Sequence, residues 1–159
     1  MLVIPPVSSL ISPVINLKSI TRNEHKRSAA SRFGKDQSRF ATAIVYCEAN
    51  FGALDGKTAN GLIRRSEKYE ILSVIDSEKA GLDTGMVLDD KPNSIPICRD
   101  LADSLAQAGS VPDAFIFGMA PSSGMLSKHE RALVLEAMSH GMNIVNGLHE
   151  FLNDDPVFA

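Results

Sequence analysis

The amino-acid sequence predicts an α/β fold, a doubly wound and mostly parallel sheet of about five strands with flanking helices. The segments rich in β-forming residues are apolar throughout instead of alternating apolar and polar, which is typical of strands buried on both faces. Segments with helical spacing separate them, and this alternation favours parallel strands joined by right-handed crossovers. The expected architecture is therefore Rossmann-like.

Five short apolar segments are the expected strands. In chain order they are residues 41–47, 69–75, 94–98, 114–117 and 142–145. Polar or glycine-containing residues follow each segment, as expected where a strand leaves a sheet.

The expected helices are defined mainly by their ends. A helix of two to three turns begins near Lys57, and Asp100 is the N-cap of a second helix that Gly109 ends. Ser127 and Glu130 have the spacing of a capping box, in which each side chain accepts a hydrogen bond from the other residue's backbone amide. They predict a third long helix.

Two segments fit this alternation less well. The stretch 82–91 is acidic and contains glycine, so we expect a loop that replaces or shortens a crossover. A final short helix is expected to begin near Leu148.

The composition limits the class of protein. The 159 residues suit one domain, and no uncharged apolar run approaches the ~20 residues that cross a bilayer, so we expect no membrane partner. Cys47 and Cys98 are too few for a disulfide framework and lack metal-ligand spacing. We therefore expect a cytoplasmic protein without a metal site.

The charge is distributed unevenly along the chain. Residues 1–40 hold seven basic and two acidic residues, whereas the rest holds nine basic and seventeen acidic residues. The acidic part would repel a phosphate backbone, so we expect no nucleic-acid partner. Residues 1–38 are interpreted as a disordered basic extension, with an organelle transit peptide as the alternative, and residues 39–156 as the folded domain.

In a parallel sheet, ligands bind beyond the carboxyl ends of the strands, near the point where the strand order reverses. This rule selects four polar or glycine-containing segments, which are residues 48–58, 76–81, 118–124 and 146–149. The candidate binding residues come from these segments.

The first segment contains Gly52, Gly56, Lys57 and Thr58. Their spacing is one residue short of the P-loop pattern G-x-x-x-x-G-K-[ST], so its amides should not wrap a phosphate as in a nucleoside triphosphatase. In one interpretation, the helix N-terminus with Lys57 and Thr58 still binds one anionic group. In the other, Gly56 only permits a tight turn and Lys57 is a solvated residue of the first helical turn.

The other segments supply further candidates. Asp76 follows the second strand and has the position of a ribose-binding carboxylate, although it could equally cap the residues after it. Gly118, Pro121 and Gly124 make a shaped loop whose amides could face a ligand, or a simple connection. His149 follows the last strand and is the candidate catalytic acid or base, with a structural imidazole as the alternative.

Several short motifs together resemble a known family. They are Lys57-Thr-Ala, Val74-Ile-Asp-Ser, Ala80-Gly, Ile95-Pro-Ile, Pro112-Asp, Gly118-Met-Ala-Pro and Gly147-Leu-His, followed by Phe151-Leu. Their order is similar to that in the N-terminal Rossmann-like domain of a bacterial and archaeal family of formerly unknown function. The resemblance implies a second domain with a genuine P-loop, and some family members are D-glutamate N-acetyltransferases. It also implies acetyl-CoA or a nucleotide as cofactor.

Two functions follow as hypotheses. In the first, the chain is the N-terminal ligand-binding half of such an acyltransferase-like enzyme, a fragment that binds a small anionic ligand and is inactive without its P-loop domain. In the second, it is a catalytically silent docking or oligomerisation domain. A homo-oligomer is expected in either case. An NAD-dependent oxidoreductase is a third hypothesis, which lacks a dinucleotide-binding fingerprint.

Overall fold

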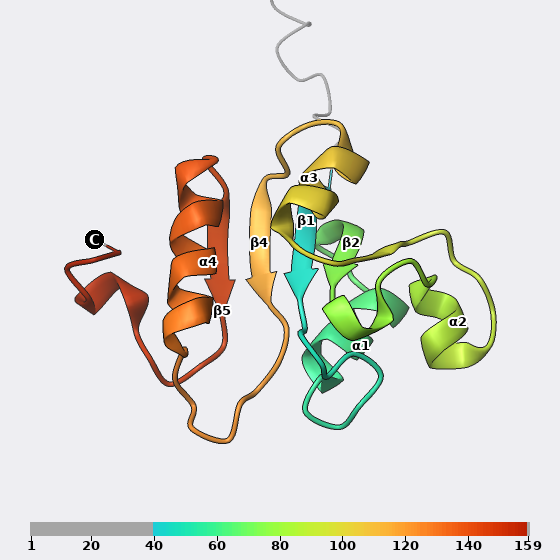
Figure 1. The fold of residues 1–159 in the computed structure, drawn as a ribbon, viewed down its shortest axis with the longest axis horizontal. Helices are drawn as coiled ribbons and strands as arrows, with labels where there is room; N and C mark the ends of the chain where they lie inside the picture. The colour runs from blue at the N-terminus through green and yellow to red at the C-terminus, as the bar shows by residue number, and fades with distance from the viewer. Residues whose placement is uncertain (1–39, 159) are drawn as a thin grey trace, which may run out of the picture. The chain divides into compact units, whose positions relative to one another are not determined.

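A computed structural model describes residues 40–158 (Figure 1). Its five strands are β1 (Ala41–Tyr46), β2 (Tyr69–Ile75), β3 (Ile97–Cys98), β4 (Ala114–Phe117) and β5 (Asn143–Asn146). The helices are α1 (Lys57–Arg64), α2 (Thr84–Asp89), α3 (Leu101–Ala108) and α4 (Lys128–Ser139), with 3-10 helices η1 (Ser77–Lys79) and η2 (Leu152–Asp154).

All four strand pairs are parallel, and the order across the sheet is β3-β2-β1-β4-β5. β1 is therefore central, and the order reverses between β1 and β4 because the chain leaves β1 toward β2 and later returns to its other side. The predicted doubly wound, parallel α/β fold is confirmed. This reversal is the place where parallel α/β sheets bind ligands.

Helices pack against both faces of the sheet. Tyr46, Phe115 and Phe117 lie on one face, in a core that includes Leu101 from α3 and Val134 from α4. On the other face, a second core contains Val45, Ile116 and Ala59 from α1, with Val87 and Leu88 from α2 packed against it. Burial on both faces explains why successive residues at the carboxyl end of β1 and throughout β4 are apolar, without alternation.

The predicted caps of α3 and α4 are present. The carboxylate of Asp100 accepts a hydrogen bond from the backbone N–H of Asp103 at 2.8 Å, and Gly109 ends α3 with a left-handed φ of 69°. Ser127 and Glu130 form both hydrogen bonds of the capping box. These helix ends could be predicted from sequence because each cap involves residues within one turn of the helix end.

The prediction of a loop over residues 82–91 was wrong, because the segment contains the short helix α2. The carboxylate of Asp83 caps this helix by accepting hydrogen bonds from the backbone N–H groups of Gly85 (2.9 Å) and Met86 (3.1 Å). It also accepts from Asn93 (3.0 Å) and Ser94 (2.7 Å). The carboxylate of Asp83 thus holds together the start of α2 and the residues that follow this helix.

Burial alone would raise the pKa of Asp83, but the amides of Asn93, Met86, Ser94 and Gly85 outweigh this effect and lower it. The carboxylate therefore stays ionised and keeps its four backbone partners.

Smaller differences concern the ends of the sheet. The third strand is confined to Ile97–Cys98, and the last strand is shifted by one residue to Asn143–Asn146. The final short helix lies at Leu152–Asp154, a few residues later than expected.

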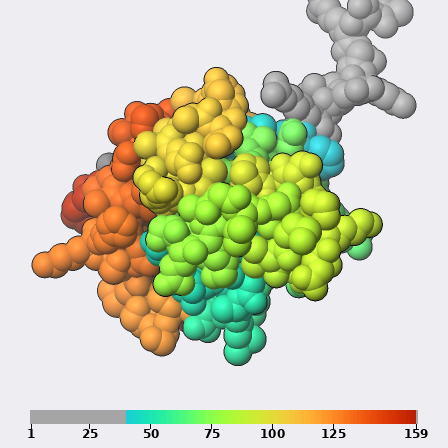
Figure 2. Space-filling model, turned by 45° about the vertical axis from the view of Figure 1, so that its right-hand side comes forward, coloured from blue at the N-terminus to red at the C-terminus, as the bar shows by residue number. Residues whose placement is uncertain are grey.

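The β3 edge of the sheet is covered by the chain itself. The backbone N–H of Gly81 donates to the Ile97 carbonyl at 2.8 Å, and that of Ile97 donates to Leu82 at 2.9 Å. In Figure 2, where this side is turned forward, the light-green segment around α2 covers the surface. Within residues 40–158, no helix is long and apolar enough to cross a membrane.

Candidate functional site

The loops after β1, β4 and β5 lie at the same end of the sheet (Figure 1), which we call the carboxyl rim. Two backbone hydrogen bonds join the first two loops across the reversal of strand order. The N–H of Ala59 donates to the carbonyl of Gly118 at 2.9 Å, and that of Ala120 donates to Asp55 at 3.1 Å. The structure therefore brings the predicted segments 48–58 and 118–124 into contact.

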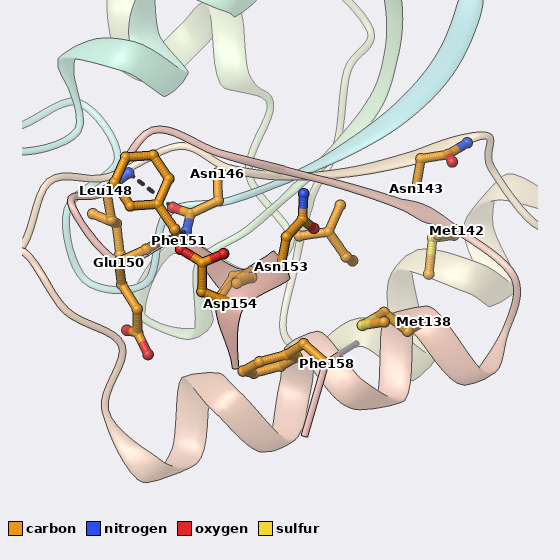
Figure 3. A pocket seen from close by; sticks show the side chains of 12 residues that line it. Met138, Met142, Asn143, Asn146, Leu148, Glu150, Phe151, Asn153, Asp154 and Phe158 are labelled. Carbon is orange, nitrogen blue, oxygen red and sulfur yellow. Dashed lines mark hydrogen bonds between the residues drawn. The ribbon is translucent and has the colours of Figure 1, made fainter. Parts of the chain in front are cut away.

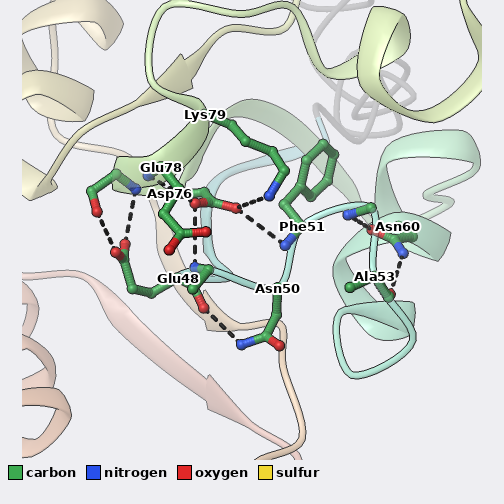
Figure 4. A network of polar contacts seen from close by, with 11 residues as sticks. Glu48, Asn50, Phe51, Ala53, Asn60, Asp76, Glu78 and Lys79 are labelled. Atoms are coloured by element: carbon green, nitrogen blue, oxygen red, sulfur yellow. Dashed lines mark hydrogen bonds and ion pairs between the residues drawn. The ribbon is translucent and has the colours of Figure 1, made fainter.

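Asp76 lies beneath the loop that follows β1, and its side chain is fully buried. Its carboxylate accepts hydrogen bonds from the backbone N–H groups of Ala49 (3.2 Å), Phe51 (3.2 Å) and Glu78 (3.1 Å), and Lys79 Nζ lies 3.3 Å away (Figure 4). The capping alternative describes this arrangement. A ribose hydroxyl could reach Asp76 only if the loop moved, and that role remains a prediction.

The amides of the loop after β1 are turned inward. The N–H of Gly52 donates to the side-chain oxygen of Asn60 at 2.9 Å, and the N–H of Ala53 donates to the carbonyl of Asn50. The side-chain amide of Asn60 also donates to the carbonyl of Ala53, at 3.0 Å (Figure 4). With the Phe51 amide bound to Asp76, three successive amides are engaged and do not surround a phosphate site.

Gly56, Lys57 and Thr58 form the start of α1. Gly56 is buried, and an added Cβ would lie 2.1 Å from the carbonyl oxygen of Asn50, so a close backbone approach requires glycine. Lys57 and Thr58 are exposed at the rim. The tight-turn interpretation of Gly56 agrees with this geometry, while anion binding by Lys57 and Thr58 remains a prediction.

Gly118 sits where β1, α1 and β4 approach one another. An added Cβ would lie 2.5 Å from Val45 Cγ1 and 3.0 Å from Ala59 Cβ. Its backbone N–H donates to the carbonyl of Tyr46 at 2.8 Å. The structure therefore gives this glycine a packing role, whether or not a ligand binds nearby.

Gly124 and His149 lie side by side at the rim. Gly124 has a φ of 67°, and an added Cβ would lie 3.1 Å from His149 Cδ2. Its N–H donates to the carbonyl of Pro121 at 2.9 Å, which closes the turn of this loop. The imidazole of His149 is exposed and has no hydrogen-bond partner within residues 40–158. It is placed for contact with a ligand or partner, but its catalytic role is untested.

Two contacts at the rim were not predicted. The carboxylate of Glu48 accepts hydrogen bonds from the N–H of Ser77, at 2.9 Å, and from the Ser77 hydroxyl. Asn60 holds the loop after β1, as described above. No sequence signal marked them, because Glu48 and Ser77 are 29 positions apart and Asn60 acts from inside a helix.

Cys47 follows β1 and is fully buried beneath this rim. Burial raises the pKa of its thiol to about 12, and the negative charge of Asp76 contributes in the same direction. The thiol is therefore protonated at neutral pH and unsuited to nucleophilic attack. Among residues 40–158, no three His, Cys, Asp or Glu side chains are grouped to hold a metal ion.

Comparison with known proteins identifies the family. A crystal structure of a DUF1611 family protein from Anabaena variabilis is similar, with a TM-score of 0.65 and 26% sequence identity. The similarity covers 74% of this chain and 32% of that chain, so the chain spans about a third of the length of its relative. A comparison with curated proteins gives no match. Residues 77–159, about half of the chain, match the Rossmann-like "Domain of unknown function (DUF1611_N)", and the chain belongs to this family.

Proposed function

We propose that this domain is the N-terminal ligand-binding half of a two-domain enzyme that resembles D-glutamate N-acetyltransferases. The other half in this proposal is a P-loop domain, and the ligand is a small anionic or nucleotide-type molecule such as acetyl-CoA. The observation that carries the proposal is the position of Lys57 and Thr58. Both are exposed at the start of α1, beside the Gly118–Gly124 loop and at the reversal of strand order.

The chemistry of this position suits an anion. The N-terminus of a helix carries partial positive charge, and Lys57 adds a full charge to it. His149 contacts Gly124 at the same rim and has an exposed imidazole. In the proposed enzyme, the second domain would cover this rim and supply the remaining ligand contacts, because domain interfaces commonly hold such sites.

Thermal protection tests the proposal. We expect acetyl-CoA, ATP, NAD or D-glutamate to raise the melting temperature of the protein, and Lys57→Gln to remove most of that increase. Lys128→Gln is the matched control, since Lys128 is also the exposed first residue of a helix at the rim. The proposal fails if no ligand protects the protein, or if both variants are protected as well as the parent.

A specific observation favours the alternative of a docking or oligomerisation domain. Three large apolar side chains are exposed on loops of the rim, with exposed fractions of 83% for Leu54, 58% for Met125 and 76% for Phe151. Such residues are often covered by another protein surface. Light scattering of the parent and of a Leu54→Ser, Met125→Ser variant tests the oligomerisation form of this alternative. Because an oligomer is expected under either function, the alternative is supported only if the variant shifts the protein toward the monomer.

A further inference from the structure

The two edges of the sheet differ in how they are protected. At the β3 edge, residues 81–84 bind the outward backbone groups: Gly81 and Leu82 bond to Ile97, and the N–H of Thr84 donates to Ile95 at 2.9 Å. At the other edge, β5 pairs only with β4 among the described strands. Exposed strand edges bind other extended chains unless they are shielded.

The outward groups of β5 can be assigned from its pairing. The N–H of Asn143 donates to the carbonyl of Asp113, so Asn143 and Val145 direct their backbone groups toward β4. The N–H and C=O groups of Ile144 and Asn146 then point outward, since these directions alternate along a strand. Within residues 40–158, no hydrogen bond occupies those outward groups. The strand carries no charge and no proline that would discourage pairing.

A groove runs beside this free edge, with a volume of about 530 Å³ (Figure 3). Met138 and Met142 line one end, Leu148 and Phe151 line the other, and Phe158 lies on the side of α4. Phe151 is 76% exposed. The groove therefore combines free backbone groups with apolar side chains, which are the two requirements for binding an added strand.

The outer wall of the groove is held in place by Arg131 of α4. Its guanidinium pairs with the carboxylates of Glu150 and Asp155, and it stacks 4.7 Å from the centre of the Phe158 ring. The segment from Glu150 to Phe158 is thus fastened to the body of the domain. A groove between two fixed walls is already formed before any partner arrives.

The charge of the groove restricts its partner. Glu150 and Asp154 are its charged lining residues, and no Lys or Arg of the described chain lines it. Glu150 is paired with Arg131, whereas Asp154 makes no ion pair within residues 40–158. Residues 143–158 contain three acidic residues and no Lys or Arg, so pairing of this segment with the same segment of a second copy would bring like charges together. A basic partner is complementary.

We propose that the β5 groove binds an extended segment of a partner protein, with apolar side chains flanked by Lys or Arg, as a sixth strand beside β5. The bound strand hydrogen-bonds to Ile144 and Asn146, and its apolar side chains contact the methionine and phenylalanine side chains of the groove. A basic side chain pairs with Asp154. Many doubly wound sheets have the strand order 3-2-1-4-5-6, in which a sixth strand lies beside the fifth, as proposed here.

The test uses capped pentapeptides and the full chain. Lys-Val-Ile-Val-Lys is the probe; Glu-Val-Ile-Val-Glu reverses its charge, and Lys-Val-Pro-Val-Lys lacks the central N–H. Hydrogen exchange resolved by residue should show that the probe slows exchange at Ile144 and Asn146. Exchange at Asn143 and Val145, which face β4, should change little. We expect the acidic peptide to bind about tenfold more weakly at low salt, and the proline peptide to give weaker protection because it lacks one backbone donor.

Reversing the charge of single acidic residues distinguishes binding in the groove from nonspecific electrostatic attraction between the peptide and the acidic protein. Asp154→Lys should weaken binding of the basic peptide and improve binding of the acidic one. Glu136→Lys is the control, because Glu136 is an exposed acid of α4 outside the groove. The proposal is overturned if the alternating protection is absent, if both peptides bind equally, or if self-association protects Ile144 and Asn146 without peptide. It stands if acetyl-CoA and its analogues fail to bind, because Lys57 and Thr58 do not line the groove.

Discussion

The carboxylate of Asp76 and the backbone N–H of Phe51 lie 3.2 Å apart, and this hydrogen bond joins the end of β2 to the loop that follows β1. Asp76 is fully buried and accepts from Ala49 as well. The loop that carries the exposed start of α1 is thus shaped by a residue with no exposed atoms. Asp76 positions this loop, and a ligand need not touch it for its loss to affect binding.

We predict that Asp76→Ala destabilises the domain by roughly 3 kcal/mol. Two backbone amides of the loop would lose their acceptor, and an unsatisfied buried donor costs about 1–3 kcal/mol. Urea unfolding measures the change, with Glu78→Ala as the control because that side chain is exposed. Equal stability of the two variants would contradict the role assigned to Asp76.

Gly56 and Gly61 should respond in opposite ways to alanine. Gly56 precedes α1 and is buried, whereas Gly61 lies inside α1 and is exposed. Gly56→Ala places a methyl group 2.1 Å from the Asn50 carbonyl oxygen, while nothing lies within 4 Å of the corresponding position at Gly61. We expect Gly56→Ala to lower the free energy of unfolding by about 1–3 kcal/mol. Gly61→Ala should raise it by about 0.5–1 kcal/mol, because alanine favours a helix.

Thermal denaturation of the two glycine variants measures these changes. The melting temperature should fall for Gly56→Ala and rise for Gly61→Ala. If Gly56→Ala melts at the same temperature as the parent, the close approach of Gly56 to the Asn50 carbonyl does not constrain the loop.

The stability of the domain should fall in alkaline solution. The pKa of Cys47 is about 12 in the folded protein, above its ordinary value of 9.0, because burial and then Asp76 oppose ionisation. Between these values the unfolded chain loses the thiol proton while the folded chain keeps it. The contribution of Cys47 to the free energy of unfolding is therefore complete below pH 9.0. It is lost progressively toward pH 12, by up to about 1.4 kcal/mol per pH unit.

Urea unfolding at several pH values between about 8 and 11 measures this decrease, in steps of roughly one unit. Cys47→Ala should reduce the slope without abolishing it, since burial also raises the pKa of Tyr46 and Cys98. An unchanged slope in the variant would show that Cys47 does not contribute.

Arg131→Met should loosen the segment from Glu150 to Phe158. The substitution keeps an apolar stem but removes both ion pairs and the contact with the Phe158 ring. We expect faster cleavage of this segment by protease in the variant. Arg65→Met is the control, because Arg65 and Glu67 form an exposed pair, and such pairs contribute little. Equal cleavage rates would show that Arg131 does not fasten the segment.

The strands were predictable from sequence because each contains a short apolar run, and β2 and β4 have the bounds that these runs indicated. The α2 helix was not, because Asp83 stabilises it partly through amides ten and eleven positions later. Contacts between residues far apart in sequence also limited how much of the candidate site could be predicted. Gly124 and His149 were both selected by the strand-end rule, whereas the contacts of Asp76, Asn60 and Arg131 depend on the folded arrangement of distant segments.

The central position of β1 also determines which part of the chain can fold alone. Thr42 of β1 and Asp113 before β4 are hydrogen-bonded across 71 positions, and β1 separates β2 from β4. The stretch that matches the family, residues 77–159, begins after both β1 and β2. Expressed by itself, that stretch would expose the edge of β4 that pairs with β1 and the apolar side chains that pack against β1. The residues that identify the family are therefore fewer than the residues that the sheet needs in order to fold.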